Sequence, residues 1–599
     1  MNSSRRGFLK AAAAMGALAS PARQLVSQAL AAGNESAAPA PARKPNILWL
    51  VSEDNCPVLG CYGDQIARTP NLDQLAAQGL RYNYCCSNAP VCAPARSTII
   101  TGMYASSLGT QHHRSRYRIP DHVKLLPQYL LQAGYFCVNN GKTDYNIATW
   151  PKDMWDAGDD WSGRKEGQPF FFVRNLGICH ESSLHKTTVH PEYLAEPFTL
   201  PPYHPDTPEI RSNWVEYYHI ITKMDAQVGE WLAKLEAAGL ADDTIVFYYG
   251  DNGGILPRSK RSLYDTGLHV PLLVRYGKNF AHLAPAQPGA AVDRLVSFVD
   301  LAPTVLSLAG MEIPTHMQGR AFAGPRVTAP DEFVYGYANR MDDRYDMLRS
   351  VCDGRFKYIR NYLPHLIYGQ HLAYLWQMPA TRSWEQAFKD GKCDATQSAF
   401  WHAKPAEELY DTQADPWEVH NLAEDAQYAQ QLARLRQANR DHLLAVRDTT
   451  FLPEPMMLQR AGKDPIRSMA QDDQRYPIAR VLAAAELAAG RDAAAVPKLI
   501  QLLGDPDAAV RYWAATGCAI RGRAAATAGD TLTALLKDAS ADVALAAADA
   551  LCRLGHADLG TPLLTRYQAQ LDTTVGNPEA HTRCLLARNL ITAQSESPT

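Results

Sequence analysis

The chain has 599 residues, of which 46% are hydrophobic and 20% charged, and its formal net charge is −3 at pH 7. A length of several typical domains predicts more than one folded unit, and the ordinary composition excludes a disordered or fibrous protein. The weak negative charge disfavours a nucleic-acid-binding protein. Twelve cysteines in a chain of this length are too few for a disulfide scaffold, and no internal apolar run is long enough to span a membrane.

The first residues carry the features of an export signal. Arg5 and Arg6 precede an Ala-rich apolar stretch at 11–19, and Ala29-Leu30-Ala31 offers a cleavage site of small residues. This order is typical of a twin-arginine signal peptide, here residues 1–31, whose cargo passes the twin-arginine translocon already folded. We therefore expect a periplasmic or otherwise extracytoplasmic protein, with an Ala/Pro-rich linker at 32–44.

Predicted strands and helices alternate from residue 45 to residue 330. The strands are expected at 46–52, 135–139, 170–175, 244–249 and 270–275, and the helices at 71–79, 126–134, 213–239 and 301–309. Such alternation predicts an α/β sandwich around a mostly parallel sheet. Acidic residues directly after the first strand place function at the carboxyl ends of the strands.

Two further regions follow the predicted sandwich. Residues 331–460, with a β-hairpin expected at 347–358, predict a smaller α+β subdomain. Residues 475–590 are rich in Ala and Leu at helical spacing, and Gly490, Gly522 and Gly555 recur at offsets of 32 and 33. This internal repeat resembles HEAT-like helical repeats. The repeats either dock on the first region or bind a partner, a protein or a second copy in a dimer.

One segment of the first region places a cysteine where an anion can bind. In Cys92-Ala-Pro94-Ala-Arg96-Ser97, a helix is expected to begin at Ser97 and to run to Met103. Cys92 would then lie near a helix N-terminus, where backbone N–H groups and the helix dipole favour an anion. Arg96 adds a fixed positive charge suited to oxyanions.

Two other segments carry oxygen ligands at the ends of strands. Glu53 and Asp54 follow the first predicted strand, and Asp251 and Asn252 follow a later one. Adjacent strand ends would bring these four side chains together as a site for a hard cation. Oxygen-only ligation favours calcium or magnesium over zinc.

Taken together, these segments resemble the sulfatases of the alkaline phosphatase superfamily that use a formylglycine nucleophile. The C-x-P-x-R pattern at Cys92, with Thr101-Gly102 after it, matches that family's modification motif. Further matching segments, in the family's order, are Lys44-Pro-Asn-Ile-Leu48, Thr69-Pro-Asn-Leu-Asp73, Gly141-Lys142, Gly250-Asp-Asn-Gly253 and Asp353-Gly-Arg-Phe-Lys-Tyr358. The resemblance spans residues 44–425 and implies an alkaline phosphatase-like fold and sulfatase activity.

The resemblance also implies a role for each matching residue. Cys92 would be converted to formylglycine (3-oxoalanine) by a formylglycine-generating or sulfatase-maturing enzyme, and its hydrated aldehyde would attack sulfur. Arg96 would orient this nucleophile, Lys142 and Lys260 would bind the sulfate, and His180 would bind substrate and protonate the leaving group. One calcium ion would be held by Glu53, which stands where the family usually has Asp, and by Asp54, Asp251, Asn252 and the modified Cys92.

One position departs from the family pattern. The family usually reads Gly-Lys-x-His, and that histidine assists the formylglycine, whereas this chain reads Gly141-Lys142-Thr143-Asp144. Asp144 either serves as a carboxylate base or marks altered chemistry.

The substrate is expected to be a sulfated glycan, hydrolysed at a sulfate ester or a sulfamate. The stretch from Gly254 to Pro271 resembles heparan N-sulfatases more than arylsulfatases, which favours a heparan-type sugar. His112, His113, Arg114 and Arg116 either contact a polyanionic sugar at the pocket rim or belong to a solvated loop, and His269 is either a site residue or a packed one. The alternatives are a formylglycine-dependent phosphonate or phosphodiester hydrolase and a non-catalytic protein that binds sulfated glycans.

Overall fold

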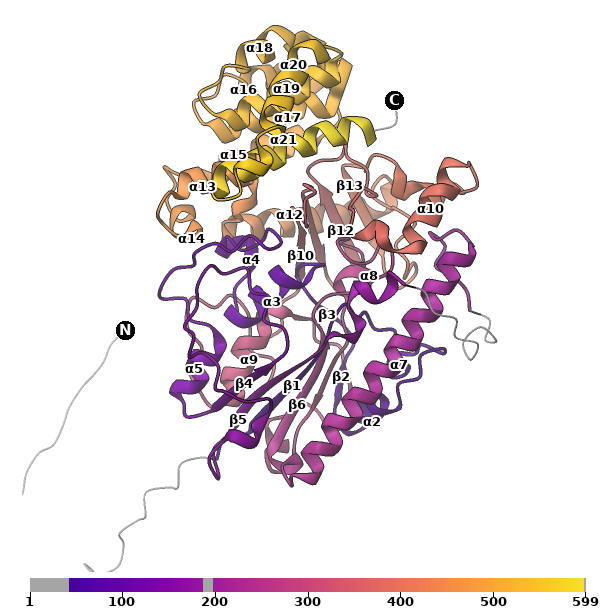
Figure 1. Ribbon diagram of the computed structural model, residues 1–599, viewed down its shortest axis with the longest axis vertical. Coiled ribbons are helices and arrows are strands. Elements are labelled where there is room, and N and C mark those ends of the chain that lie inside the picture. The colour runs from indigo at the N-terminus through magenta and orange to yellow at the C-terminus, as the bar shows by residue number, and fades with distance from the viewer. Residues whose placement is uncertain (1–42, 187–197, 597–599) are drawn as a thin grey trace, which may run out of the picture. The chain divides into compact units, whose positions relative to one another are not determined.

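The computed structural model of the protein describes residues 43–186 and 198–596 (Figure 1). The predicted signal peptide and all but the last two residues of the predicted linker lie outside the described residues.

The catalytic region is built on a seven-stranded sheet with the order β4-β5-β1-β6-β7-β2-β8. The strands β4, β5, β1 and β6 run parallel, and β7 runs antiparallel to β6, so the sheet is mostly parallel as predicted. Every residue of β1 is buried, because β1 pairs with β5 on one side and β6 on the other beneath two helical layers. The strands are β1 Asn46–Ser52, β2 Leu80–Tyr82, β4 Phe136–Asn140, β5 Phe170–Leu176, β6 Thr244–Gly250, β7 Leu272–Arg275 and β8 Ala291–Val292.

Helices cover both faces of this sheet (Figure 1). On one face, Ile47, Trp49 and Val51 of β1 share a core with α3 (Cys92–Thr101), α5 (Leu126–Gln132) and α9 (Leu301–Leu308). On the other face, Leu48 and Leu50 share a core with α2 (Pro70–Gln78) and α7 (Pro208–Ala237). Alternate residues of one strand therefore feed two separate cores, as the two-residue period of a strand requires.

The helix α3 begins earlier than the sequence predicted. It starts at Cys92 rather than at Ser97, with Val91 in extended conformation as its N-cap. Pro94 falls within the first turn, where backbone N–H groups have no partner inside the helix, so a proline fits there without breaking it. The helix ends at Gly102, whose φ of 65° lies in the left-handed region.

A second, antiparallel sheet has the order β10-β11-β12-β13. Its strands are β10 Val334–Ala338, β11 Leu348–Cys352, β12 Phe356–Asn361 and β13 Glu407–Asp411. The hairpin predicted at 347–358 is formed by β11 and β12, and Gly354 takes a φ of 90° in its turn. The helix α12 (Ala429–Val446) packs against this sheet, and Leu435 shares a core with Val351 and Tyr358.

The C-terminal part is a stack of short helices (Figure 1). The buried residues of α16 to α19 form one apolar cluster that is rich in alanine and leucine. Gly522 and Gly555, two of the recurring glycines, follow α17 and α19 directly, with φ angles of 52° and 104°. The helices are α13 Glu454–Ala461, α14 Ile466–Ala470, α15 Ile478–Ala489, α16 Val496–Leu502, α17 Ala508–Arg521, α18 Gly529–Leu535, α19 Ala541–Leu554, α20 Ala557–Gln568 and α21 Pro578–Glu596.

This helical stack contacts the catalytic region through buried charges. Glu454, fully buried at the start of α13, accepts hydrogen bonds from Arg340 and from the hydroxyls of Tyr117 and Tyr345. On α21, Glu596 binds the guanidinium of Arg344. Within the predicted repeats, Asn589 accepts from the Tyr345 backbone N–H and donates to the Asp343 carbonyl, and Trp513 donates to the Phe451 carbonyl. The repeats are therefore docked on the preceding part of the chain, one of the two roles left open for them.

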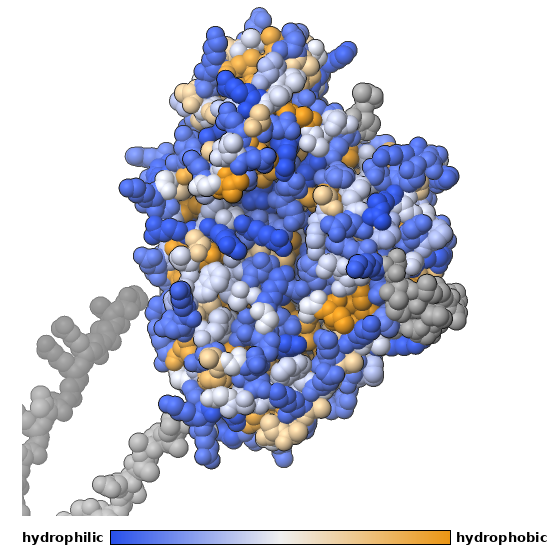
Figure 2. All heavy atoms as spheres, viewed as in Figure 1, coloured by the Kyte–Doolittle hydropathy of each residue, from blue (hydrophilic) through white to orange (hydrophobic). Residues whose placement is uncertain are grey.

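Polar side chains cover most of the face seen in Figure 2. Within the described ranges, the large hydrophobic side chains that are exposed are those of Val327, Leu559 and Val575. None of the helices in those ranges combines the length and the apolar character that a membrane span requires.

Candidate active site

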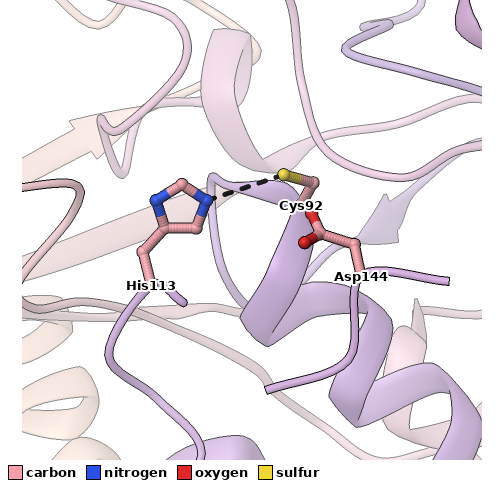
Figure 3. A group of neighbouring side chains, drawn as sticks. All are labelled: Cys92, His113 and Asp144. Atoms are coloured by element: carbon pink, nitrogen blue, oxygen red, sulfur yellow. Dashed lines mark hydrogen bonds between the residues drawn. The ribbon is translucent and has the colours of Figure 1, made fainter. Parts of the chain in front are cut away.

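Cys92 lies at the N-terminal end of α3, close to one histidine and one carboxylate (Figure 3). Its Sγ is 3.8 Å from Nε2 of His113, and the ligand atoms of Cys92, His113 and Asp144 all lie within 4.8 Å of one another. His113 reaches the thiol from the loop after α4 (Ala105–Leu108), and Asp144 from the loop after β4. Three segments far apart in the sequence thus converge on one sulfur atom.

The thiol of Cys92 stays protonated at neutral pH. Burial raises its pKa to about 12, and the charges of Lys260 and Lys142 oppose this effect only in part. Because the thiolate is the nucleophilic form of cysteine, a buried thiol with this pKa is a poor nucleophile at neutral pH.

Four oxygen-bearing side chains meet beside Cys92, as the strand ends predicted. Ser52 of β1 lies opposite Gly250 of β6, so the residues that follow these two strands are neighbours. The Asp54 backbone N–H donates to Oδ1 of Asp251 at 3.0 Å, and Nδ2 of Asn252 lies 2.7 Å from both aspartates. Glu53, Asp54, Asp251 and Asn252 are all buried.

Three cations surround this acidic cluster. The Nε of Arg96 donates to Asp251 at 2.8 Å, and Nζ of Lys142 lies 2.8 Å from Glu53. Nζ of Lys260 lies 2.7 and 2.8 Å from the two carboxylate oxygens of Asp54. Each predicted cationic residue therefore pairs with one predicted metal-binding carboxylate.

The cluster keeps its groups charged although they are buried. Burial by itself raises the pKa of Asp251, but Arg96 and Lys142 overcome this effect and hold it at about 2. Burial likewise lowers the pKa of Lys260, but Asp54 and Glu181 raise it well above its ordinary value. Asp251 therefore remains anionic, and Lys260 cationic, at every physiological pH.

The donor set fits a divalent cation. The site contains six carboxylates and four permanently cationic groups: Glu53, Asp54, Asp144, Glu181, Asp251 and Asp342, with Arg96, Lys142, Lys260 and Arg261. In addition, the buried Oδ1 of Asn252 has no hydrogen-bond partner among the described residues, which leaves an amide oxygen free to ligate.

A second charged network contacts His113 on the side of its ring that faces away from Cys92. Its Nδ1 lies 3.0 Å from Oδ1 of Asp342, and Arg261 binds Asp342 at 2.8 Å. Arg261 also forms a two-pronged pair with Glu181, at 2.8 and 2.9 Å. Asp342, Arg261 and Glu181 were not predicted from the sequence. Glu181 and Arg261 adjoin the predicted His180 and Lys260, but no motif marks Asp342.

Asn175 is another functional residue that the sequence reasoning missed. It lies in β5, and its Oδ1 accepts a hydrogen bond from Nη1 of Arg96 at 2.6 Å. Its position near the end of a predicted strand was a usable signal, because strand ends at this edge carry the site.

His180 lies at the edge of the acidic cluster. Its Nδ1 is 2.9 Å from Oγ of Ser182, and its ring is half-buried. The next residue, Glu181, donates its backbone N–H to Asp54 at 2.8 Å, which fixes His180 beside the cluster. The assigned role of His180 in protonating a leaving group stays a prediction.

The remaining histidines occupy different surroundings. His112 is buried beside Tyr345, and burial lowers its pKa to about 4, so its ring is neutral at neutral pH. Its predicted contact with substrate stays a prediction. His269 is partly buried and stacks on Tyr84, with ring centroids 4.6 Å apart, as expected for a packed residue.

Arg114 and Arg116 are exposed and line a cavity of about 640 Å³ beside Lys142 and Asp144. The cavity lies next to Cys92, because Asp144, which lines the cavity, has a carboxylate oxygen within 4.8 Å of the Cys92 sulfur. Both side chains are exposed, so their contact with a polyanionic sugar stays a prediction.

Comparison with known proteins relates three parts of the chain to known families. Residues 45–146 and 137–311 match the sulfatase family model, and residues 258–368 match the model "N-sulphoglucosamine sulphohydrolase, C-terminal". Residues 464–552 match the HEAT repeat model, in agreement with the internal repeat.

Individual proteins give the same picture. An ulvan-active sulfatase of Formosa agariphila is 36% identical over 469 residues, which cover 70% of this chain and 78% of that protein. Human N-sulphoglucosamine sulphohydrolase is 26% identical over 465 residues, covering 66% and 89% of the two chains. The crystal structure of a putative sulfatase from Bacteroides thetaiotaomicron shares the fold, with a TM-score of 0.51 at 19% identity, over 68% of this chain and 94% of that one.

Proposed function

The chain belongs to the sulfatase family, and from this premise we propose that it hydrolyses the sulfate groups of a sulfated glycan with a formylglycine made from Cys92 and a bound calcium ion. The observation that carries the proposal is the position of Cys92. It lies at a helix N-terminus, next to three cations and beside an oxygen-only cation site.

The form of Cys92 is the first part of the proposal. As a thiol, Cys92 has a pKa of about 12 and makes a poor nucleophile. Conversion to formylglycine would supply a hydrated aldehyde, whose hydroxyl is a nucleophile that needs no thiolate. His113 Nε2 lies 3.8 Å from the present Sγ, close enough to accept a proton from a hydroxyl in this position.

The cation site is the second part. Glu53, Asp54, Asp251 and Asn252 would hold the calcium ion, and the ion would supply positive charge that stabilises sulfate oxygens. Lys142 and Lys260 lie on two sides of the cluster and would bind the remaining sulfate oxygens. Arg96 is held by both Asp251 and Asn175, so its guanidinium is fixed in place to orient the modified Cys92.

Asp144 takes the place of the family histidine. Burial raises its pKa, but Lys142 overcomes this effect and lowers it, so the group is an anion. An anion beside Lys142, 3.4 Å away, is suited to positioning that lysine and the hydroxyl of the modified Cys92. We infer that Asp144 orients while His113 accepts the proton, which divides the work of the missing histidine between two residues.

The substrate is proposed to be an acidic sulfated polysaccharide. The two relatives named above act on ulvan and on N-sulphoglucosamine, as their names state. The match of residues 258–368 to the N-sulphoglucosamine sulphohydrolase model supports a heparan-type sugar, and the higher identity to the ulvan-active protein supports ulvan. Both polysaccharides belong in the first screen.

Export through the twin-arginine route remains part of the proposal. The paired arginines, the apolar stretch and the small-residue cleavage site support it. Because that route carries folded proteins, the conversion of Cys92 would precede export.

The experiment is a sulfate-release assay with protein co-expressed with a formylglycine-generating enzyme. Ulvan and heparin oligosaccharides, 4-nitrophenyl sulfate, a phosphonate monoester and a phosphodiester serve as substrates, with and without a calcium chelator. We expect sulfate release that the chelator lowers and that added calcium restores. Faster cleavage of the phosphonate or phosphodiester would support the hydrolase alternative, and binding without any release would support a non-catalytic protein.

A further inference from the structure

The cavity beside the nucleophile carries two arginines that no part of the proposed reaction uses. It has a volume of about 640 Å³ and is lined by the segments 114–116 and 141–150. Lys142 and Asp144 line one part of it, and Arg114 and Arg116 line another. A substrate whose sulfate contacts Lys142 therefore extends into a space that the two arginines border.

No carboxylate in the described ranges pairs with Arg114 or Arg116. The one acidic residue that lines the cavity is Asp144, and Lys142 lies 3.4 Å from its carboxylate. The chain as a whole has a net charge of −3, so uncompensated positive charge in one cavity is a local feature of this site. Such a cavity attracts an anionic ligand.

The backbone holds the arginines in an unusual conformation. Arg114, Arg116 and Asp144 have φ angles of 60°, 56° and 51°, in the left-handed region that residues other than glycine rarely adopt. Backbone strain of this kind is found at sites that clamp a ligand.

The two segments that form the cavity are tied to each other and to α3. Nδ2 of Asn146 donates to the carbonyls of Thr110 and His112, both at 2.8 Å. Its backbone N–H donates to Oγ of Ser97 in α3, at 2.9 Å. The cavity is therefore fixed relative to Cys92 before any ligand binds, which lowers the entropic cost of binding.

Aromatic side chains complete the cavity. Tyr145 and Trp150 both line it, with ring centroids 5.5 Å apart in an edge-to-face arrangement. Both are only partly buried. Aromatic faces next to a few polar groups are typical of ligand pockets, and they suit the C–H faces of a sugar ring.

We infer that this cavity is a subsite for the sugar next to the sulfated one, and that Arg114 and Arg116 bind an oxyanion which that sugar carries. The inference rests on the proposed function for the placement of the sulfate at Lys142. The oxyanion is the carboxylate of a uronic acid or a second sulfate ester, since guanidinium groups bind both in the same two-pronged way.

The test measures binding rather than turnover. The protein is prepared with Cys92→Ala, so that neither formylglycine nor hydrolysis is involved, and calorimetry records the affinity for three disaccharides. The first carries one sulfate and a uronate carboxylate, the second is its carboxyl-reduced form, and the third is the reduced form with a second sulfate. The arginines are varied as R114A/R116A in this background. R118A is the matched control, because Arg118 is exposed in the same segment but does not line the cavity.

We expect the parent and R118A proteins to bind the carboxylate-bearing probe about tenfold or more tightly than its reduced form, which corresponds to about 1.4 kcal/mol. In R114A/R116A the ratio of the two affinities falls to about one. Recovery of affinity by the second sulfate shows that the subsite accepts either oxyanion, and no recovery shows that it selects the uronate carboxylate.

Equal affinities for all three probes in the parent protein would overturn the inference, as would a preference that survives R114A/R116A or is lost in R118A. Failure of the proposed function is visible separately, because the protein with Cys92 intact would then release no sulfate while the binding preference persists.

Discussion

The catalytic region and the helical repeats of this chain are stabilised in opposite ways. In the catalytic region, the residues around Cys92 come from segments as far apart as Glu53, Lys142 and Asp251. In the repeats, the helices α15 to α20 pack on helices nearby in the sequence, and the core of α16 to α19 is mostly alanine and leucine. Activity therefore depends on long-range charge placement in one region, and stability depends on local apolar packing in the other.

The two regions meet at the segment 339–345. Glu454 of α13 binds Arg340, and Glu596 of α21 binds Arg344. Between these anchors lies Asp342, which holds His113 against Cys92. This segment thus links the helices α13 and α21 to the residues around the nucleophile. Changes in the site, at the junction and in the repeats should therefore have separable effects.

Replacing the nucleophile should abolish activity without changing stability. We expect Cys92→Ala to lower kcat at least ~10⁴-fold, equivalent to about 5.5 kcal/mol of transition-state stabilisation. The free energy of unfolding, measured in urea, should stay close to the parent value, because the substitution removes one small atom. Activity within tenfold of the parent would show that another group attacks the substrate.

Removing the buried charge at the junction should affect stability strongly. Glu454→Gln leaves Arg340 buried without its anionic partner, and we expect a loss of about 4 kcal/mol in the free energy of unfolding at pH 7. Burial raises the pKa of Glu454, but Arg340 and His112 overcome this effect and lower it well below its ordinary value of 4.5. Its stabilising contribution is therefore complete above pH 4.5 and lost at lower pH.

The pH dependence provides the control for this variant. The difference in unfolding free energy between parent and Glu454→Gln should shrink as the pH falls well below 4.5. A difference that stays constant down to acid pH would mean that the substitution acts through packing rather than through charge.

A cavity inside the repeats should lower stability and leave catalysis intact. Leu532 of α18 is fully buried in the repeat core, and we expect Leu532→Ala to cost about 3 kcal/mol in unfolding free energy. Because Leu532 lies in the core of the repeats and outside the junction, kcat should match the parent below the unfolding transition. A parallel fall in kcat would show that the repeats and the site are coupled throughout and not only at the junction.

Removing the proton acceptor should lower activity by a smaller amount than removing the nucleophile. We expect His113→Ala to lower kcat about a hundredfold, with a smaller change in KM, since general-base groups contribute on this scale. Asp342→Asn, which disturbs the orientation of His113, should lower kcat by less. If His113→Ala changed KM alone, the residue would bind substrate, as the sequence first indicated, and would not accept a proton.

Much of the fold could be predicted from the sequence, because its signals are local. Apolar runs such as 46–52 identified the strands, and the glycine spacing identified the repeats. The start of α3 was predicted five residues too late, because Pro94 was taken to precede the helix whereas it fits inside the first turn. Docking of the repeats depends on Glu454 and Glu596, which no local pattern distinguishes from surface acids.

The candidate site was predictable where a motif or a strand end marked the residue. Cys92, Arg96 and Lys142 lie in such motifs, and the structure brings them together with Glu53 and Asp251. Asp342 carries no sequence signal, since it reaches His113 only through the folding of a distant loop. His113 was expected either at the pocket rim or in a solvated loop, but its ring is buried against Cys92.

The form of Cys92 in the mature protein tests the account most directly. Mass spectrometry of the peptide that contains Cys92, from protein made in its native host, distinguishes an aldehyde from a thiol by mass. We expect the aldehyde mass in most of the protein, together with sulfate release by the same sample. An intact thiol throughout, in a sample that still releases sulfate, would contradict the formylglycine mechanism.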